Sequence, residues 1–199
     1  MLKSDRQHLI LASSSPRRQE LIRTLNIPFE IRVSDVDETT PTFWSPAQVV
    51  EQLALRKAEK VRETLQAGEQ GIIIGADTIV VQDYRVLGKP KDDNDAIWMI
   101  GLLQGKTHQV YSGVACIDAA SGETHVSHRI TYVTMKHLTD QQIANYVASG
   151  EPRDKAGAYA IQGLGATIVE SIEGCYFNVV GLPLSLLSDM LAKFGVEVL

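Results

Sequence analysis

Apolar and polar residues follow one another along the chain in two patterns, which predict strands and helices in turn. Short apolar runs bounded by turn residues predict strands, and apolar residues that repeat every three or four positions predict helices. Strands are predicted over residues 8–13, 29–33, 71–82, 108–117, 123–135, 166–172 and 176–180. Helices are predicted over residues 17–25, 46–65, 92–103, 139–149 and 182–194.

The order of these elements indicates the fold class. Strand–helix crossovers at the start of the chain favour parallel strands, and Ala120-Ser121-Gly122 between two long strands predicts an antiparallel hairpin. We therefore expect an α/β protein with a mixed sheet flanked by helices. The chain has no internal repeat, low-complexity tract or linker, so residues 1–199 are expected to form one domain.

The composition narrows the class of protein. With 199 residues, 44% hydrophobic and 22% charged, the chain can bury its own core. A formal charge of −5 argues against broad binding of nucleic acid or an anionic membrane. No apolar run approaches the roughly 20 residues of a membrane span, and the first residues lack a secretory signal, so we expect a cytoplasmic protein. Cys116 and Cys175 stand apart, which predicts neither a zinc site nor a disulfide.

Asp77 is the first candidate for chemistry. It interrupts a continuous apolar run over residues 71–82, the pattern of a strand covered on both faces. A carboxylate there has to be neutral, paired or bound to a cation. Asp35, Asp37 and Glu38 can supply a second oxygen ligand for a hard cation. The alternative for Asp77 is a structural aspartate bonded to nearby N–H groups. The alternative for Asp35, Asp37 and Glu38 is an exposed acidic turn.

A phosphate site is predicted where the first strand meets the first helix. The segment Ser13-Ser14-Ser15-Pro16-Arg17-Arg18 places serines and two arginines at a helix N-terminus, which favours an anion. The alternative is a simple helix cap with two solvated arginines.

Three further residues are candidates for binding a phosphorylated ligand. Lys57, beside a buried helical face, and Lys89, in a Gly-Lys-Pro turn, can neutralise phosphate oxygens. Gln162 offers both a donor and an acceptor, which suits the edge of a nucleobase. Exposed lysines and a glutamine bonded to backbone are the alternatives.

Several other classes of site are excluded by missing motifs. The five histidines show no HExxH spacing, and His125 and His128 lie three apart in a predicted strand, so they face opposite sides. The chain has no GxSxG, GxxxxGK[ST] or GxGxxG sequence. Hydrolysis assisted by a divalent cation is a reaction class that these missing motifs do not exclude.

Five segments together resemble the Maf family of nucleotide pyrophosphatases. They are Leu11–Arg18, Gly75–Thr78, Gly88–Pro90, Asp154–Tyr159 and Val180–Pro183, and they occur in the order typical of that family. The resemblance spans nearly the whole chain. It implies a fold similar to the inosine triphosphatase superfamily, with an elongated mixed sheet and a central cleft between two lobes, and a homodimer.

The resemblance also implies an activity and roles for individual residues. It implies cleavage of a nucleoside triphosphate into a monophosphate and pyrophosphate with Mg²⁺ or Mn²⁺. Asp77 matches the catalytic acidic residue, acting as a general base or through the cation, and Glu38 matches an acidic residue that assists at the metal. The positions that match phosphate-binding residues are Ser13, Arg18, Lys57 and Lys89.

Three positions resemble one branch of the family, which acts on dTTP and UTP. Arg17, Thr78 and Gln162 agree with that branch, whereas the 7-methyl-GTP branch typically has Trp, Gln and Glu. A glutamine can both give and accept hydrogen bonds with uracil or thymine, while a glutamate accepts from guanine. Ala160 departs from the glycine that relatives often carry. The alternatives are a pyrophosphatase for 7-methyl-GTP or other modified purine nucleotides, and a nucleotide-binding regulator of cell division and septum formation.

Overall fold

Three strands of 11 or 12 residues are the longest elements of the sheet: β3 (Ile72–Gln82), β5 (Thr107–Asp118) and β6 (Thr124–Met135). The computed structural model describes residues 8–33 and 35–199. The chain divides into two compact units, and the divisions fall inside these strands or beside Gly181. Unit 1 holds the described residues up to Asp77, with Ser112–Arg129 and Gly181–Leu199, and unit 2 holds Thr78–Tyr111 and Ile130–Val180.

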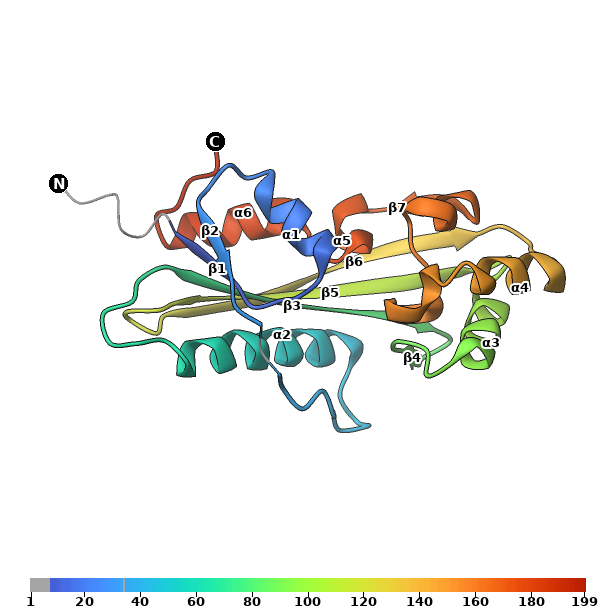
Figure 1. Ribbon diagram of the computed structural model, residues 1–199, viewed down its shortest axis with the longest axis horizontal. Helices are drawn as coiled ribbons and strands as arrows, with labels where there is room; N and C mark the ends of the chain where they lie inside the picture. Colours follow the sequence, from blue (N-terminus) through green and yellow to red (C-terminus); the bar gives the residue numbers. More distant parts are fainter. Residues whose placement is uncertain (1–7, 34) are drawn as a thin grey trace. The chain divides into compact units, whose positions relative to one another are not determined.

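Unit 1 combines parallel strands with part of the β5–β6 hairpin, and it has helices on both faces. Its further elements are β1 (Leu9–Leu11), α1 (Pro16–Arg23), β2 (Phe29–Ile31), α2 (Pro46–Glu63) and α6 (Leu184–Lys193). Strand β1 pairs in parallel with β2 and with β3. Figure 1 shows α2 on one side of β1 and β3, and α1 and α6 on the other. Because both faces are covered, residues 72–77 of β3 are buried without alternation.

Helix α2 begins where its sequence predicts. Ser45 and Gln48 form a reciprocal capping box, and Pro46 occupies the first helical turn. Its buried stripe includes Ala54, Ala58 and Val61, which pack with alternate residues of β1, β3 and β5. Gly75 of β3 faces this stripe: a Cβ atom there would overlap the carbonyl oxygen of Ala54 and lie 3.0 Å from the nitrogen of Ala58. The helix and strand backbones are therefore in direct contact.

Unit 2 combines antiparallel strands with helices. Its further elements are β4 (Arg85–Leu87), α3 (Asp93–Leu103), α4 (Asp140–Ala148), the 3₁₀ turns η1 (Glu151–Asp154), η2 (Ala156–Ala158) and η3 (Gly163–Thr167), β7 (Val169–Glu173) and α5 (Tyr176–Val180). Strand β4 pairs antiparallel with the end of β3 through a turn at Asp83 and Tyr84, both at positive φ. Strand β7 pairs antiparallel with β6. The seven strands follow the order β2-β1-β3-β5-β6-β7, with β4 on β3.

The core of unit 2 contains a buried polar pair. The Nε2 atom of His108 lies 2.6 Å from the hydroxyl of Tyr159, and the two rings meet edge to face. His108 is 2% exposed, and its Nδ1 atom has no hydrogen-bond partner among the described residues. Burial lowers the pKa of His108 to about 4, because the charged imidazolium loses its hydration.

Most of the predicted elements are confirmed. The mixed α/β architecture, the hairpin of β5 and β6 and the five long helices agree with the sequence patterns. His128 contacts Glu51 of α2 and His125 contacts Phe194 beyond α6, so the two histidines do face opposite sides. Both cysteines are free, Cys116 being buried and Cys175 half-buried. Within the described chain, every helix is too short or too polar to cross a membrane.

The predicted strand over residues 176–180 is wrong, because this segment is the helix α5. Its β-branched and aromatic residues favour a strand, but the buried amide of Asn178 donates to the carbonyl of Val110 and to Thr131 Oγ1. Cys175 N also donates to Thr131 Oγ1. These side-chain bonds take the place of a strand ladder. The preceding predicted strand starts later than expected, because residues 163–167 form the turn η3.

We expect Gly75→Ala to destabilise the protein by about 1–3 kcal/mol, since the added methyl group forces α2 away from β3. Chemical denaturation measures this change. Gly101→Ala is the matched control: Gly101 is exposed in α3 with open space around its Cβ position, and alanine there should be stabilising or neutral. Equal effects of the two substitutions would contradict the close helix–strand contact.

We also expect the stability of the protein to fall as the pH drops from 6.5 toward 4. The depressed pKa of His108 means that the unfolded chain binds a proton in this window while the folded chain does not. Its contribution is therefore complete above pH 6.5 and is lost toward pH 4, at up to about 1.4 kcal/mol per pH unit. His108→Gln should flatten this slope in the free energy of unfolding. An identical slope in the variant would show that His108 is not its source.

Candidate functional site

Asp77 is held in an ionic cluster within unit 1. It is 8% exposed in the middle of β3, and Lys57 Nζ of α2 donates to its Oδ1 atom at 2.6 Å. The same ammonium lies 2.8 Å from Oε1 of Glu38, whose side chain is 54% exposed. One lysine therefore bridges a buried carboxylate and a carboxylate open to solvent.

The charges in this cluster influence one another. Burial raises the pKa of the Asp77 carboxyl above its ordinary value, and the charges of Lys57 and Arg18 oppose that rise. Burial also lowers the pKa of the Arg18 guanidinium, which the Asp77 carboxylate opposes. A guanidinium nevertheless stays protonated, so the cluster places two cations beside Asp77.

Arg18 joins the start of α1 to three other segments. Its Nε atom donates to the carbonyl of Gly181 at 2.8 Å, and its Nη1 atom donates to the carbonyl of Ala76 at 2.9 Å. Nη1 also lies 3.4 Å from Oγ of the buried Ser13. The serine hydroxyl accepts from Ser15 N as well, which fixes the loop between β1 and α1. Arg17 lies beside Arg18 on α1 and is half-buried.

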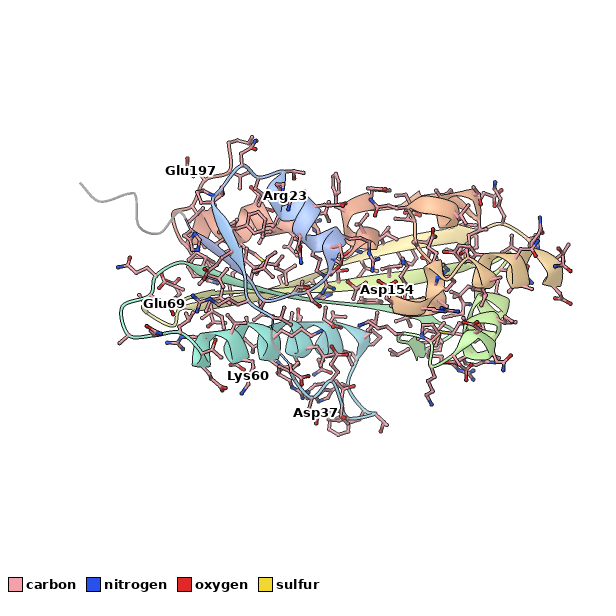
Figure 2. The ribbon with its side chains drawn as sticks, viewed as in Figure 1. Arg23, Asp37, Lys60, Glu69, Asp154 and Glu197 are labelled. Carbon is pink, nitrogen blue, oxygen red and sulfur yellow. The ribbon has the colours of Figure 1, made fainter. Side chains whose placement is uncertain are left out.

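A second arginine, which the sequence patterns do not single out, holds the acidic segment in place. Arg56 Nη1 donates to the carbonyls of Asp37 and Thr39 at 3.0 and 2.9 Å, on either side of Glu38. Its guanidinium also lies over the ring of Trp44, 5.5 Å from the centroid. Figure 2 shows Asp37 on the segment that lies beside α2. The only clue in the sequence is the position of Arg56 next to Lys57.

Only one of the three acidic candidates reaches the lysine. Glu38 pairs with Lys57, whereas the Asp37 carboxylate accepts from the backbone N–H of Thr39 in a local turn. Asp35 lines an open surface depression against α2. Among the described residues there is no group of three or more histidine, cysteine or acidic side chains suited to a metal. Asp77 and Glu38 are the two carboxylates that contact Lys57.

The remaining predicted residues belong to unit 2. Thr78 follows Asp77 directly in β3, and Lys89 lies in the loop after β4. Gln162 precedes the turn η3. The loops that carry Lys89 and Gln162 are connected, since Gly157 N donates to the carbonyl of Gly88 at 3.0 Å. Ala160 is not at positive φ, so its backbone conformation does not require a glycine.

The cluster in unit 1 has two chemical abilities. Lys57, Arg17 and Arg18 place positive charge near a buried carboxylate, which favours an anionic ligand such as a phosphate. Asp77 can take a proton from water or bind a hard cation together with Glu38. The structure brings Arg18 next to Ser13 and to the backbone carbonyl of Ala76, and Lys57 next to Asp77.

Comparison with known proteins adds close relatives. A dTTP/UTP pyrophosphatase of Desulforamulus reducens is 53% identical over 190 residues, covering 96% of this chain and 98% of that protein. One of Pelotomaculum thermopropionicum is 52% identical over 193 residues, covering 97% of this chain and 100% of the relative. One of Bacillus cytotoxicus is 50% identical, covering 93% and 94%.

Two solved structures match this chain at low identity. The Staphylococcus aureus Ham1 protein matches with a TM-score of 0.48 at 15% identity, covering 94% of this chain and 98% of that chain. A nucleoside-triphosphatase or dITP/XTP pyrophosphatase of Mycobacterium abscessus matches with a TM-score of 0.39 at 18% identity, covering 64% and 72%.

The sequence profile of one family covers almost all of the chain. The family described as Maf-like protein matches residues 8–194, a range that contains every candidate residue discussed above. The relatives that are about half identical over nearly their full length agree with this match. The chain belongs to the family of Maf-like proteins.

Proposed function

We propose that this protein is a nucleoside triphosphate pyrophosphatase that hydrolyses dTTP and UTP, and modified uridine triphosphates, to the monophosphate and pyrophosphate. The observation that carries the proposal is the near-full-length identity of about half to relatives named dTTP/UTP pyrophosphatase. Arg17, Thr78 and Gln162, the set that resembles the dTTP and UTP branch, support the same substrates.

Asp77 is the catalytic residue in this proposal. Water adds to the α phosphorus, the bond from that phosphorus to the oxygen that bridges the α and β phosphates breaks, and pyrophosphate leaves with that oxygen. The attacking water has to lose a proton, and the Asp77 carboxylate can accept it. Its burial supports this role, because desolvation raises the pKa of the Asp77 carboxyl and makes it a stronger base, although the charge of Lys57 opposes that rise.

A divalent cation, Mg²⁺ or Mn²⁺, fits the donors present. Glu38 and Asp77 direct oxygens at one ammonium, so the two carboxylates already share a single positive charge. Mg²⁺ is commonly held by one or two carboxylates together with substrate phosphates and water, which suits a pair of protein oxygens. Bound there, the cation would neutralise phosphate oxygens and polarise the anhydride.

The other candidate residues divide between phosphate and base. Ser13, Arg18, Lys57 and Lys89 bind phosphate oxygens, through one hydroxyl and three cations. Arg17, Thr78 and Gln162 select the base, and the amide of Gln162 pairs with the donor and acceptor of uracil or thymine. The homodimer stays a prediction from the family resemblance, and the cytoplasmic location stays a prediction from the sequence pattern.

A substrate panel tests the proposed activity. The purified protein, with Mg²⁺ or Mn²⁺, should release pyrophosphate from dTTP and UTP and much less from 7-methyl-GTP, and a chelator should abolish the release. Release from 7-methyl-GTP alone would overturn the choice of substrate. Binding of dTTP or UTP without turnover would favour the nucleotide-binding regulator instead.

Asp77→Asn should lower kcat/KM for dTTP by about a hundredfold or more, since the amide cannot accept a proton from water. The assay is pyrophosphate release, with circular dichroism as the check on folding. Asp118→Asn is the matched control in the same unit: Asp118 is also a buried carboxylate, but it caps the β5–β6 turn through the N–H groups of Ala120 and Ser121. A folded Asp77→Asn protein with full activity would remove Asp77 from the mechanism.

A further inference from the structure

The carboxylate of Glu151 organises a loop in unit 2 that the proposed mechanism does not use. Its Oε1 atom accepts from the hydroxyl of Tyr146 at 2.7 Å and from the N–H of Gly165 at 2.9 Å. Its Oε2 atom accepts from the N–H of Leu164 at 2.9 Å. An ionised carboxylate has room for about four such bonds, so it can hold several donors at once.

The Tyr146 hydroxyl extends this network to the other side of Gln162. While it donates to Glu151, it also accepts from the N–H of Ala160 at 3.1 Å. Tyr146 is 6% exposed, so its position is fixed by packing as well as by these bonds. The backbone N–H groups of Ala160, Leu164 and Gly165 therefore bond to the side chains of Glu151 and Tyr146. These three residues lie on both sides of Gln162 in the chain.

The loop also fits closely over the carboxylate. Gly163, which follows Gln162 directly, has φ +63°, and a Cβ atom there would overlap Oε2 of Glu151. A Cβ atom on Gly165 would overlap the carbonyl of Ala160. The Gln162 side chain makes no capping bond to η3, the turn that it precedes. The backbone is thus constrained on both sides of Gln162, while its amide is not used to cap the turn.

The ionised state of the Glu151 carboxylate supports its role as the acceptor in this network of hydrogen bonds. Burial alone would raise the pKa of Glu151, but the hydrogen bonds from Tyr146, Gly165 and Leu164 outweigh that effect, and the pKa lies below its ordinary value. A carboxylate that stays ionised remains an acceptor for all of its donors.

We propose that Glu151 and Tyr146 form a positioning pair for the recognition of the base, acting through Gln162. This inference rests on the proposed function, in which Gln162 reads uracil or thymine. A glutamine amide that turns over presents its donor and acceptor in reverse order, which pairs with cytosine instead. Selection of uracil over cytosine also requires the amide to lie at a fixed place beside the edge of the base, and the backbone of Gln162 sets that place. The pair touches neither the phosphates nor the reacting atoms in this proposal.

The first test compares UTP with CTP. Glu151→Gln keeps the shape of the side chain but replaces one acceptor oxygen with a donor group, and Tyr146→Phe removes the hydroxyl. Each variant should lower the ratio of kcat/KM for UTP to that for CTP by roughly tenfold or more, because a misplaced group loses most of an oriented interaction. Glu170→Gln, an exposed carboxylate of β7, is the matched control and should leave the ratio unchanged.

A double variant separates positioning from general damage. If Glu151 acts through Gln162, then Glu151→Gln added to Gln162→Ala should cause no further loss of the UTP-to-CTP ratio. Independent, additive losses would overturn the proposal. So would an unchanged ratio in a folded Glu151→Gln or Tyr146→Phe protein, or an equal fall in kcat/KM for both nucleotides.

Binding measurements keep this proposal distinct from the proposed function. Calorimetry of UTP and CTP in an Asp77→Asn background reports base selection without turnover, and Glu151→Gln should reduce that selection too. Failure of the wild-type protein to hydrolyse UTP while it still binds UTP selectively would contradict the proposed activity alone. Unchanged selectivity in the Glu151→Gln background would contradict the positioning role alone. Faster hydrogen exchange at the N–H groups of Leu164 and Gly165 should accompany the loss of selectivity.

Discussion

The direct packing of α2 on β3 is the constraint on which the candidate site depends. Gly75 lets the strand backbone touch the helix backbone near Ala54 and Ala58, and Lys57 lies one residue before Ala58. Two residues beyond Gly75 on the strand is Asp77, which the lysine reaches at 2.6 Å. Gly113 of β5 makes a similar approach to α2. Glycines of two strands therefore allow this helix to pack closely against the sheet. The close packing of the two backbones brings the side chains of Lys57 and Asp77 within reach of each other.

Buried charge is the second organising feature, and it costs stability unless it is paired. Asp77 is accompanied by Lys57 and Arg18, and Arg18 is in turn fixed by carbonyls of Ala76 and Gly181. The protein carries a net charge of −5, yet this cluster is locally rich in cations. Such an arrangement attracts a small polyanion to one place while the rest of the surface repels it. That contrast suits a phosphorylated metabolite better than nucleic acid.

The two units use side-chain to backbone bonds for a common purpose. In unit 1, Arg56 holds the carbonyls that flank Glu38, and in unit 2, Glu151 holds the N–H groups that follow Gln162. A loop alone places a side chain loosely, whereas a charged group that binds several backbone atoms fixes the loop. Neither Arg56 nor Glu151 belongs to a residue pattern that points to chemistry. The roles of both residues follow from their hydrogen bonds in the structure.

The sequence by itself determined the local elements and the candidate residues. The helix start at residue 46, the apolar run around Asp77 and the turn Ala120-Ser121-Gly122 depend on residues close together in the chain, so local patterns predict them. The tertiary structure decided the features that depend on partners distant in the chain, which are the helical conformation of residues 176–180 and the acidic partner of Lys57. Asn178 turned a strand-like segment into α5 by bonding to β5 and β6, and Glu38 rather than Asp35 or Asp37 reached Lys57. Those choices join residues far apart in the chain, where local propensity carries no information about geometry.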